Sequence, residues 1–317
     1  MEIRVGWIVC KTRIVRNKVP ACFPCILVGV LAVVMVGCSS GPAPAPAPVQ
    51  PPVPVVAKAA PKIGLALGGG AARGFAHVGV IQVLEEAGIR PDLVVGTSAG
   101  SLVASLYASG RTGAQLQQVA ESLEEAALTD WTLPIFSRGM LRGEALARYV
   151  NGLVDNKLIE NMPRPLGIVA TDLGTGQGVL FSRGSTGTAV RASSAVPSVF
   201  QPVSIGGRDY VDGGLVSPVP VRYARQMGAD VVIAVDISSP PEGNPAGDSL
   251  QILLQTFAIM AKSINTLELR DADVVVRPAL AGVKSADFTA KRRAIEAGRS
   301  AMQQALPQLR AALAAQM

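Results

Sequence analysis

A short apolar run that leads directly into a Gly-x-Ser-x-Gly pattern is the feature that most restricts how this chain can fold. Residues 92–95 read Asp-Leu-Val-Val and are followed by Gly96-Thr97-Ser98-Ala99-Gly100, after which a helix-forming segment continues to residue 109. In a nucleophile elbow, a strand turns sharply into a helix and lifts a serine hydroxyl above the edge of a sheet. Glycines beside the serine lack the Cβ atoms that would clash in such a turn. The stretch therefore predicts a strand–serine–helix unit with Ser98 as the candidate nucleophile.

Short apolar runs alternate with helical segments through the chain after residue 62. Strands are predicted at residues 62–67, 92–95, 166–171, 178–182, 231–235 and 273–277, and the last two helices at 250–269 and 289–314. This alternation favours a mostly parallel α/β sheet. The mainly helical region 112–160 is interrupted by an apolar segment at 130–136, for which we favour packing on the core over a lip above a lipid site.

The amino terminus differs sharply in composition from the rest of the chain. The formal net charge of 317 residues is +6, and residues 1–37 carry +4 of it. All four cysteines precede the globular part, so no disulfide framework or cysteine-based zinc site is available to the fold. The remainder has no basic patch with interleaved aromatic residues, which argues against nucleic acid as a partner. These cysteines are Cys10, Cys22, Cys25 and Cys38.

An apolar run at residues 21–37 follows a basic segment and is typical of a signal peptide. It ends in Met35-Val36-Gly37-Cys38-Ser39-Ser40, which resembles the lipobox of bacterial lipoproteins. The resemblance implies cleavage before Cys38 and lipidation of this residue, and Ser39 implies the outer membrane, with the domain facing the periplasm. An uncleaved transmembrane anchor is the alternative interpretation.

Residues 41–61 are rich in proline and alanine. Such a segment stays in extended polyproline II because proline lacks an amide donor. Twenty residues at about 3.1 Å each reach up to roughly 60 Å. We therefore expect a signal peptide at 1–37, a lipidated cysteine and linker at 38–61, and a folded domain at 62–317.

A glycine-rich loop, Gly68-Gly69-Gly70-Ala71-Ala72-Arg73-Gly74, follows the first predicted strand. Consecutive glycine amides at the start of a helix can bind a phosphate or stabilise an oxyanion. A Walker loop would end in Gly-Lys-Ser/Thr, and a dinucleotide loop would have glycine at Arg73, so both phosphate motifs fit poorly. A tight turn without chemical function is the structural alternative.

The base that would activate Ser98 is the remaining question. His77 is the sole histidine, and it precedes Ser98, whereas hydrolases with a Ser-Asp-His triad place histidine after the serine. On its apolar helix His77 is expected to be a packed structural residue. A carboxylate must then act, and it requires desolvation or tight coupling, because an unperturbed aspartate has a pKa of about 3.9. Asp212, in Asp212-Gly213-Gly214, is the best candidate by motif, and the alternatives are Asp172, Asp209 and Asp236.

The glycine-rich loop, the Gly-Thr-Ser-Ala-Gly elbow and the Asp-Gly-Gly motif together are similar to the patatin-like phospholipase family. Residues 170–173, 192–200 and 228–236 also resemble its bacterial members. The resemblance implies a three-layer α/β/α fold with a mostly parallel central sheet. It also implies Ser98 as nucleophile, Asp212 as base, and an oxyanion hole formed by Gly68, Gly69, Gly70 and Arg73.

The reaction implied by this resemblance is hydrolysis of fatty acyl esters of phospholipids or lysophospholipids through an acyl-enzyme. It needs no metal and no organic cofactor, and its partners are the membrane lipid and the membrane that holds Cys38. Three alternatives are kept: a small-ester or thioester hydrolase on the same Ser-Asp dyad, a nucleotide-binding lipoprotein, and a catalytically silent binding module.

Overall fold

The computed structural model describes Gly41 and residues 60–128, 130, 138–242, 247–284 and 287–316. The predicted signal peptide, Cys38 and most of the linker lie outside these ranges, as does the apolar segment at 130–136 except for Asp130. The centre of the folded domain is an 8-stranded sheet with the strand order β10-β9-β1-β2-β4-β8-β7 and with β5 paired to β4.

Five parallel strands form the continuous part of this sheet. They are β1 (Ile63–Leu67), β2 (Leu93–Thr97), β4 (Leu166–Asp172), β9 (Val231–Val235) and β10 (Val274–Val276). Every residue of β2, β4 and β9 is buried, as expected for parallel strands covered on both faces. The predicted alternation of strands and helices is therefore confirmed, and so is the mostly parallel sheet.

Antiparallel strands complete one side of the sheet. These are β5 (Gly178–Phe181), β7 (Val203–Ile205) and β8 (Arg208–Asp212), while β3 (Gly139–Leu141) and β6 (Ser198–Phe200) form a separate parallel pair. Three of them, β3, β6 and β7, span 3 residues each. Strands this short show no alternating pattern, which explains why the sequence did not predict them.

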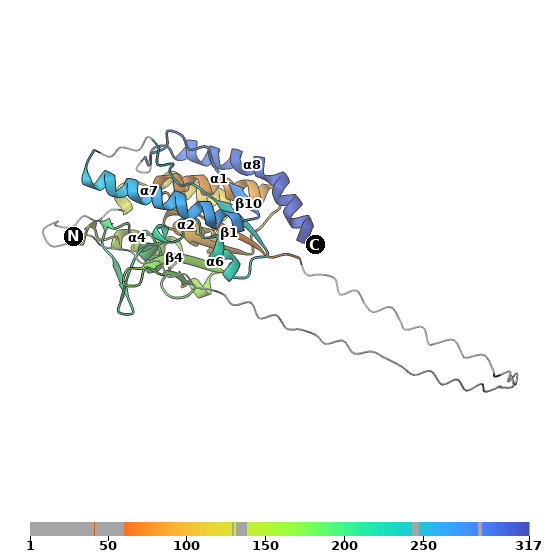
Figure 1. The fold of residues 1–317 in the computed structure, drawn as a ribbon, viewed down its shortest axis with the longest axis horizontal. Coiled ribbons are helices and arrows are strands. Elements are labelled where there is room, and N and C mark those ends of the chain that lie inside the picture. The colour runs from red at the N-terminus through yellow and green to blue at the C-terminus, as the bar shows by residue number, and fades with distance from the viewer. Residues whose placement is uncertain are drawn as a thin grey trace, which may run out of the picture. The chain divides into compact units, whose positions relative to one another are not determined.

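Helices cover both faces of the sheet and form the two outer layers. Leu65 and Leu67 of β1 pack in the same cluster as α1 (Phe75–Glu86), α2 (Ala99–Ala108) and α8 (Lys291–Gln316). Ala66 faces the opposite side and packs with α6 (Val221–Gln226), because successive side chains of a strand point to opposite faces. In Figure 1, α1 and α8 lie side by side, and they pack directly on each other. The fold is thus the expected three-layer α/β/α arrangement.

The described ranges contain four further helices. They are α3 (Gly113–Ser122), α4 (Glu144–Leu153), α5 (Thr186–Ser193) and α7 (Ser249–Glu268), with the short 3₁₀ turns η1 (Ala71–Gly74), η2 (Glu125–Leu128), η3 (Ile159–Asn161), η4 (Gly213–Leu215) and η5 (Leu269–Asp271). Of these helices, α3, α4 and α5 contribute to the same core cluster as α1, α2 and α8. Among the described helices, none is both long and apolar enough to cross a bilayer.

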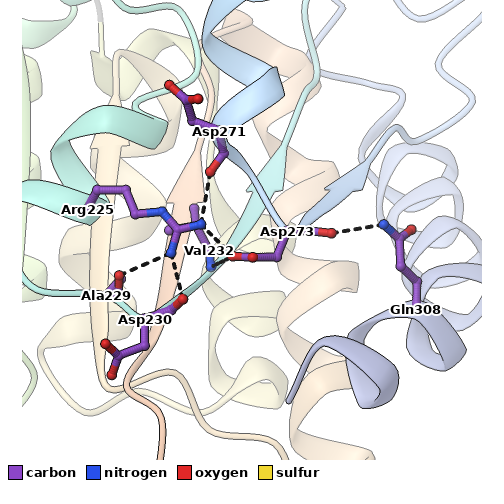
Figure 2. Close-up of polar contacts among 7 residues, drawn as sticks. All are labelled: Arg225, Ala229, Asp230, Val232, Asp271, Asp273 and Gln308. Atoms are coloured by element: carbon purple, nitrogen blue, oxygen red, sulfur yellow. Dashed lines mark hydrogen bonds and ion pairs between the residues drawn. The ribbon is translucent and has the colours of Figure 1, made fainter. Parts of the chain in front are cut away.

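A polar network ties together the elements at the beginnings of β9 and β10 (Figure 2). Arg225 of α6 donates to the carbonyl oxygens of Ala229, Asp230 and Asp271 and lies 2.7 Å from the carboxylate of Asp273. The same carboxylate accepts the Val232 amide at 2.6 Å. This network lies at the amino ends of these strands, whereas the glycine-rich loop and Ser98 follow the carboxyl ends of β1 and β2. It therefore stabilises the fold away from the candidate site.

Candidate active site

Ser98 occupies a strained turn between β2 and α2. Its φ of 52° and ψ of −124° are unusual for a residue with a side chain. The flanking glycines are required by space, because an added Cβ would lie 2.4 Å from the Gly100 carbonyl oxygen at Gly96 and 2.1 Å from the Leu67 carbonyl oxygen at Gly100. The predicted strand–turn–helix geometry is confirmed, and Ser98 is half-buried at its apex.

Two buried side chains hold this turn in place. The Ser98 amide donates to the Ser193 hydroxyl at 2.8 Å, and that hydroxyl donates to the Val169 carbonyl at 2.5 Å. The Thr97 hydroxyl donates to the carbonyl oxygen of Ser217 at 2.9 Å. Ser193 and Thr97 are fully buried. Sequence reasoning did not single out either residue, because their roles depend on partners from distant elements.

Asp212 lies beside Ser98, close enough for the serine hydroxyl to lower the pKa of its carboxyl. The base candidate is the last residue of β8, which pairs antiparallel with β4. Its carboxylate also accepts the Gly214 amide at 2.6 Å. Gly213 must be a glycine, since an added Cβ would lie 2.2 Å from the Val169 carbonyl oxygen. The structure thus brings together the two residues of the predicted dyad, Ser98 and Asp212.

The environment of Asp212 shifts the pKa of its carboxyl toward neutral pH. Burial raises the pKa of this carboxyl from 3.8 to about 6, and the hydrogen bonds from Gly214 and Ser98 oppose the rise. Desolvation disfavours the charged form of a carboxylate, which is why burial dominates. A carboxylate with a pKa near the working pH is a better general base than an exposed aspartate.

The three alternative carboxylates have other partners. Asp209 is paired with Arg138 at 2.7 Å and accepts the Ser204 hydroxyl. Asp236 accepts the Ser238 amide and lies 3.4 Å from the guanidinium of Arg277. Asp172 accepts the amides of residues 174 and 175. Among the four candidates, Asp212 is the carboxylate whose pKa is affected by the neighbouring Ser98 hydroxyl.

The glycine-rich loop passes next to Ser98, where an added Cβ at Gly69 would lie 3.2 Å from the serine Cβ. The Gly68 amide donates to the Val235 carbonyl at 3.0 Å and the Gly69 amide to the Pro218 carbonyl at 2.9 Å. These two amides are therefore not available to an oxyanion in this structure, which corrects the prediction for Gly68 and Gly69. Within the described ranges, no acceptor is found for the amides of Gly70 and Ala71.

Arg73 and His77 stabilise this loop from within. Arg73 is buried and its Nε donates to the Gly70 carbonyl at 3.4 Å. Burial lowers the pKa of Arg73 to about 10, so it stays cationic at neutral pH. His77 is fully buried, and its Nε2 donates to the Gly68 carbonyl at 2.8 Å. Burial lowers the pKa of His77 to about 4, so it is neutral, and its predicted structural role is confirmed.

A charged surface cavity lies apart from the predicted site residues. A surface cavity of about 540 Å³ beside the start of α8 is lined by charged residues that include Glu121, Lys291 and Arg292, and by none of the predicted site residues. In the part of the chain that the structure describes, no cluster of three or more histidine, cysteine or carboxylate side chains could hold a metal ion.

Comparison with known proteins identifies the same family that the three sequence motifs resemble. Residues 65–225 match the model of the family described as patatin-like phospholipase. An uncharacterized NTE family protein of Mycobacterium tuberculosis is 39% identical over 190 residues, which cover 60% of this chain and 52% of that protein. Patatin-like phospholipase domain-containing protein 6 of Mus musculus is 37% identical over 198 residues, which cover 59% of this chain and 14% of that protein.

A solved structure shares the fold at low sequence identity. VipD from Legionella pneumophila superposes with a TM-score of 0.54 at 16% identity, over 79% of this chain and 67% of VipD. The matched region spans about half the length of the mycobacterial relative. The family model covers half of the chain, and the strand–elbow–helix geometry and the Asp-Gly-Gly turn agree with it. This chain belongs to the patatin-like phospholipase family.

Proposed function

We propose that this protein is a serine acyl hydrolase that cleaves fatty acyl esters of phospholipids or lysophospholipids. The observation that carries the proposal is the position of the buried Asp212 carboxylate beside the Ser98 hydroxyl at the apex of a strained elbow. Family membership supports a lipid ester as the substrate class. The dyad and the choice of lipid are the parts that experiment must test.

The first half of the reaction forms an acyl-enzyme. The Ser98 oxygen attacks the ester carbonyl carbon while the Asp212 carboxylate takes the hydroxyl proton. The tetrahedral intermediate then expels the alcohol part of the lipid, whose oxygen receives the proton back from Asp212. The fatty acyl group is left bound to Ser98 as an ester.

The second half restores the enzyme. Asp212 takes a proton from a water molecule, and the resulting hydroxide oxygen attacks the acyl-Ser98 carbonyl. When this intermediate collapses, the fatty acid leaves and the Ser98 oxygen regains its proton. Asp212 acts as base in both halves, so a single carboxylate suffices where a triad would use histidine.

Backbone amides stabilise the negative oxygen of both intermediates. Gly70 and Ala71 supply the donors, because their amides have no acceptor within the described ranges and Gly69 brings the loop against Ser98. The cationic side chain of Arg73 adds a positive charge to the same loop. Loss of one such donor typically lowers the rate by about 10²–10³.

A panel of substrates tests the proposal. Release of free fatty acid from phospholipids and lysophospholipids is compared with hydrolysis of short-chain esters and thioesters, using the wild-type chain and Ser98→Ala. The proposal predicts release from at least one lipid class and its loss in Ser98→Ala. Cleavage of short esters or thioesters without any lipid would support the small-substrate alternative instead.

The location of the enzyme is part of the proposal. Lipidation of Cys38 holds the domain on the bacterial cell envelope, at the outer membrane facing the periplasm, and the proline-rich linker gives it reach toward its substrate. Metabolic labelling with a fatty acid tests this: Cys38 in the wild-type chain incorporates label, and Cys38→Ala does not. Equal incorporation in both chains would contradict lipidation at Cys38.

A further inference from the structure

A buried carboxylate on α7 contacts the loop that connects the parts of the proposed site. Only Asn265 and Glu268 are buried among the residues of this helix, and both lie near its end. One oxygen of Glu268, Oε1, accepts the Ser217 hydroxyl at 2.5 Å and the Arg222 amide at 3.4 Å. The other oxygen, Oε2, is buried and has no hydrogen-bond partner among the described residues.

Ser217 lies in a segment that touches all three parts of the site. Its carbonyl oxygen accepts the hydroxyl of Thr97, the residue before the nucleophile. The next carbonyl, that of Pro218, accepts the Gly69 amide of the glycine-rich loop. The Ser217 amide donates at 2.9 Å to the carbonyl of Gly213, the residue after the base. A shift of this segment would therefore move the elbow, the loop and the base relative to one another.

Burial of the charged Glu268 carboxylate opposes folding. A gain in stability is therefore a poor explanation for a glutamate at this position. The side chain of Glu268 is 6% exposed, and burial raises the pKa of its carboxyl against the opposing effects of Ser217 and Arg222. A buried carboxylate oxygen without a hydrogen bond is costly, and the ion pair of Glu268 with Arg222, at 3.8 Å, offsets part of this cost. An apolar residue could supply neither the Arg222 contacts nor the Ser217 contact, and the Ser217 contact is the one that leads to the elbow and the glycine-rich loop.

The end of α7 is itself held firmly. η5 follows Glu268 directly, and the Asp271 carbonyl of this turn accepts the guanidinium of Arg225 at 3.0 Å (Figure 2). The Arg225 network thus stabilises the turn after the helix, and it is separate from the hydrogen bond that joins Glu268 to Ser217.

We propose that Glu268 is a positioning residue for the acyl-transfer site. By holding the Ser217 hydroxyl, it keeps the carbonyls of residues 217 and 218 where Thr97 and Gly69 can donate to them. This keeps Ser98 and the oxyanion amides in register. The proposal rests on the function proposed above, and it adds a residue that touches neither the substrate nor Ser98.

The test uses the full chain and measures how fast a fluorophosphonate labels Ser98, together with kcat and KM on a lipid ester. Glu268→Ala is expected to lower the labelling rate and kcat by about 10- to 100-fold, the cost of a small misplacement of reacting groups, with little change in KM. Glu268→Gln retains an acceptor for the Ser217 hydroxyl and is expected to restore most of the rate. Ser217→Ala should match Glu268→Ala, and the double variant should lose no more than either, as two residues of one contact do.

Arg225→Ala is the matched control. It weakens the anchoring of the same helix end without touching Ser217, so it is expected to lower the melting temperature and leave the labelling rate unchanged. If Arg225→Ala slows labelling as much as Glu268→Ala, general loss of stability explains the effect, and the positioning role is overturned.

The outcomes distinguish this proposal from the proposed function. A wild-type chain that is not labelled overturns the proposed function and this inference with it. A labelled wild type with Glu268→Ala folded and labelled at the same rate overturns the inference and leaves the proposed function standing. If Glu268→Ala does not fold, Ser217→Ala decides: wild-type labelling in that variant overturns the inference, and slowed labelling supports it.

Discussion

Replacement of Asp212 by asparagine is predicted to stabilise the protein while it removes the activity. Burial raises the pKa of this carboxyl from 3.8 to about 6. Between these two values the folded state binds more protons than the unfolded state, so stability falls as the pH rises through this window and stays low above it. The charged carboxylate therefore opposes folding at neutral and alkaline pH.

The size of the effect follows from the shift. One pKa unit corresponds to about 1.36 kcal/mol, so about two units predict a gain of about 3 kcal/mol for the uncharged asparagine at pH 8. At pH 5, below the folded pKa of about 6, the gain is expected to be about half as large. For a domain of this size, about 3 kcal/mol raises the melting temperature by roughly 6–12 °C.

Thermal unfolding of the wild type, Asp212→Asn and Ser98→Ala at pH 5 and pH 8 provides the assay. Ser98→Ala is the control, because it is expected to be equally inactive but keeps the buried carboxylate, and so should gain nothing at pH 8. An Asp212→Asn variant that is no more stable than the wild type at pH 8, or whose advantage does not grow between pH 5 and pH 8, would refute this account of the Asp212 environment.

Three further predictions follow from the same contacts. The rate kcat/KM should rise about tenfold between pH 5 and pH 8 with a midpoint near the Asp212 pKa of about 6, and a pH–rate profile without a step there would contradict Asp212 as the base. His77→Gln should label with a fluorophosphonate at the wild-type rate, because His77 is a neutral buried donor to the Gly68 carbonyl; an inactive but folded variant would give His77 a chemical role. Gly100→Ala should destabilise the fold by at least about 3 kcal/mol in denaturant unfolding, since its Cβ would lie 2.1 Å from the Leu67 carbonyl oxygen, and near-native stability would contradict this elbow geometry.

The elbow and the parallel strands were predictable because their signals are local. An apolar run such as β9, predicted at residues 231–235 and observed at Val231–Val235, needs nothing beyond its own sequence to be recognised. The same holds for Ser98, where glycines at two fixed positions reveal a tight turn. His77 could be excluded as the triad base by its order in the chain, without any structure.

Other parts of the site depend on tertiary contacts that no local pattern records. The motif favoured Asp212, but its burial and its position beside Ser98 depend on the antiparallel pairing of β8 with β4. The donors of the oxyanion loop could not be assigned, because two of its amides are used by the carbonyls of Val235 and Pro218. Ser193 and Glu268 act through contacts to distant elements, so nothing near them in the sequence marks their roles.

The most direct test of the central claim is to locate a covalent adduct on the nucleophile. After reaction with a fluorophosphonate, peptide mass spectrometry of the wild type should place the phosphonyl group on Ser98. Ser98→Ala should carry no adduct, and Asp212→Asn should react at least about 100-fold more slowly, the contribution expected of a general base. An unmodified wild type, an adduct on another residue, or wild-type reactivity in Asp212→Asn would contradict the Ser98–Asp212 dyad.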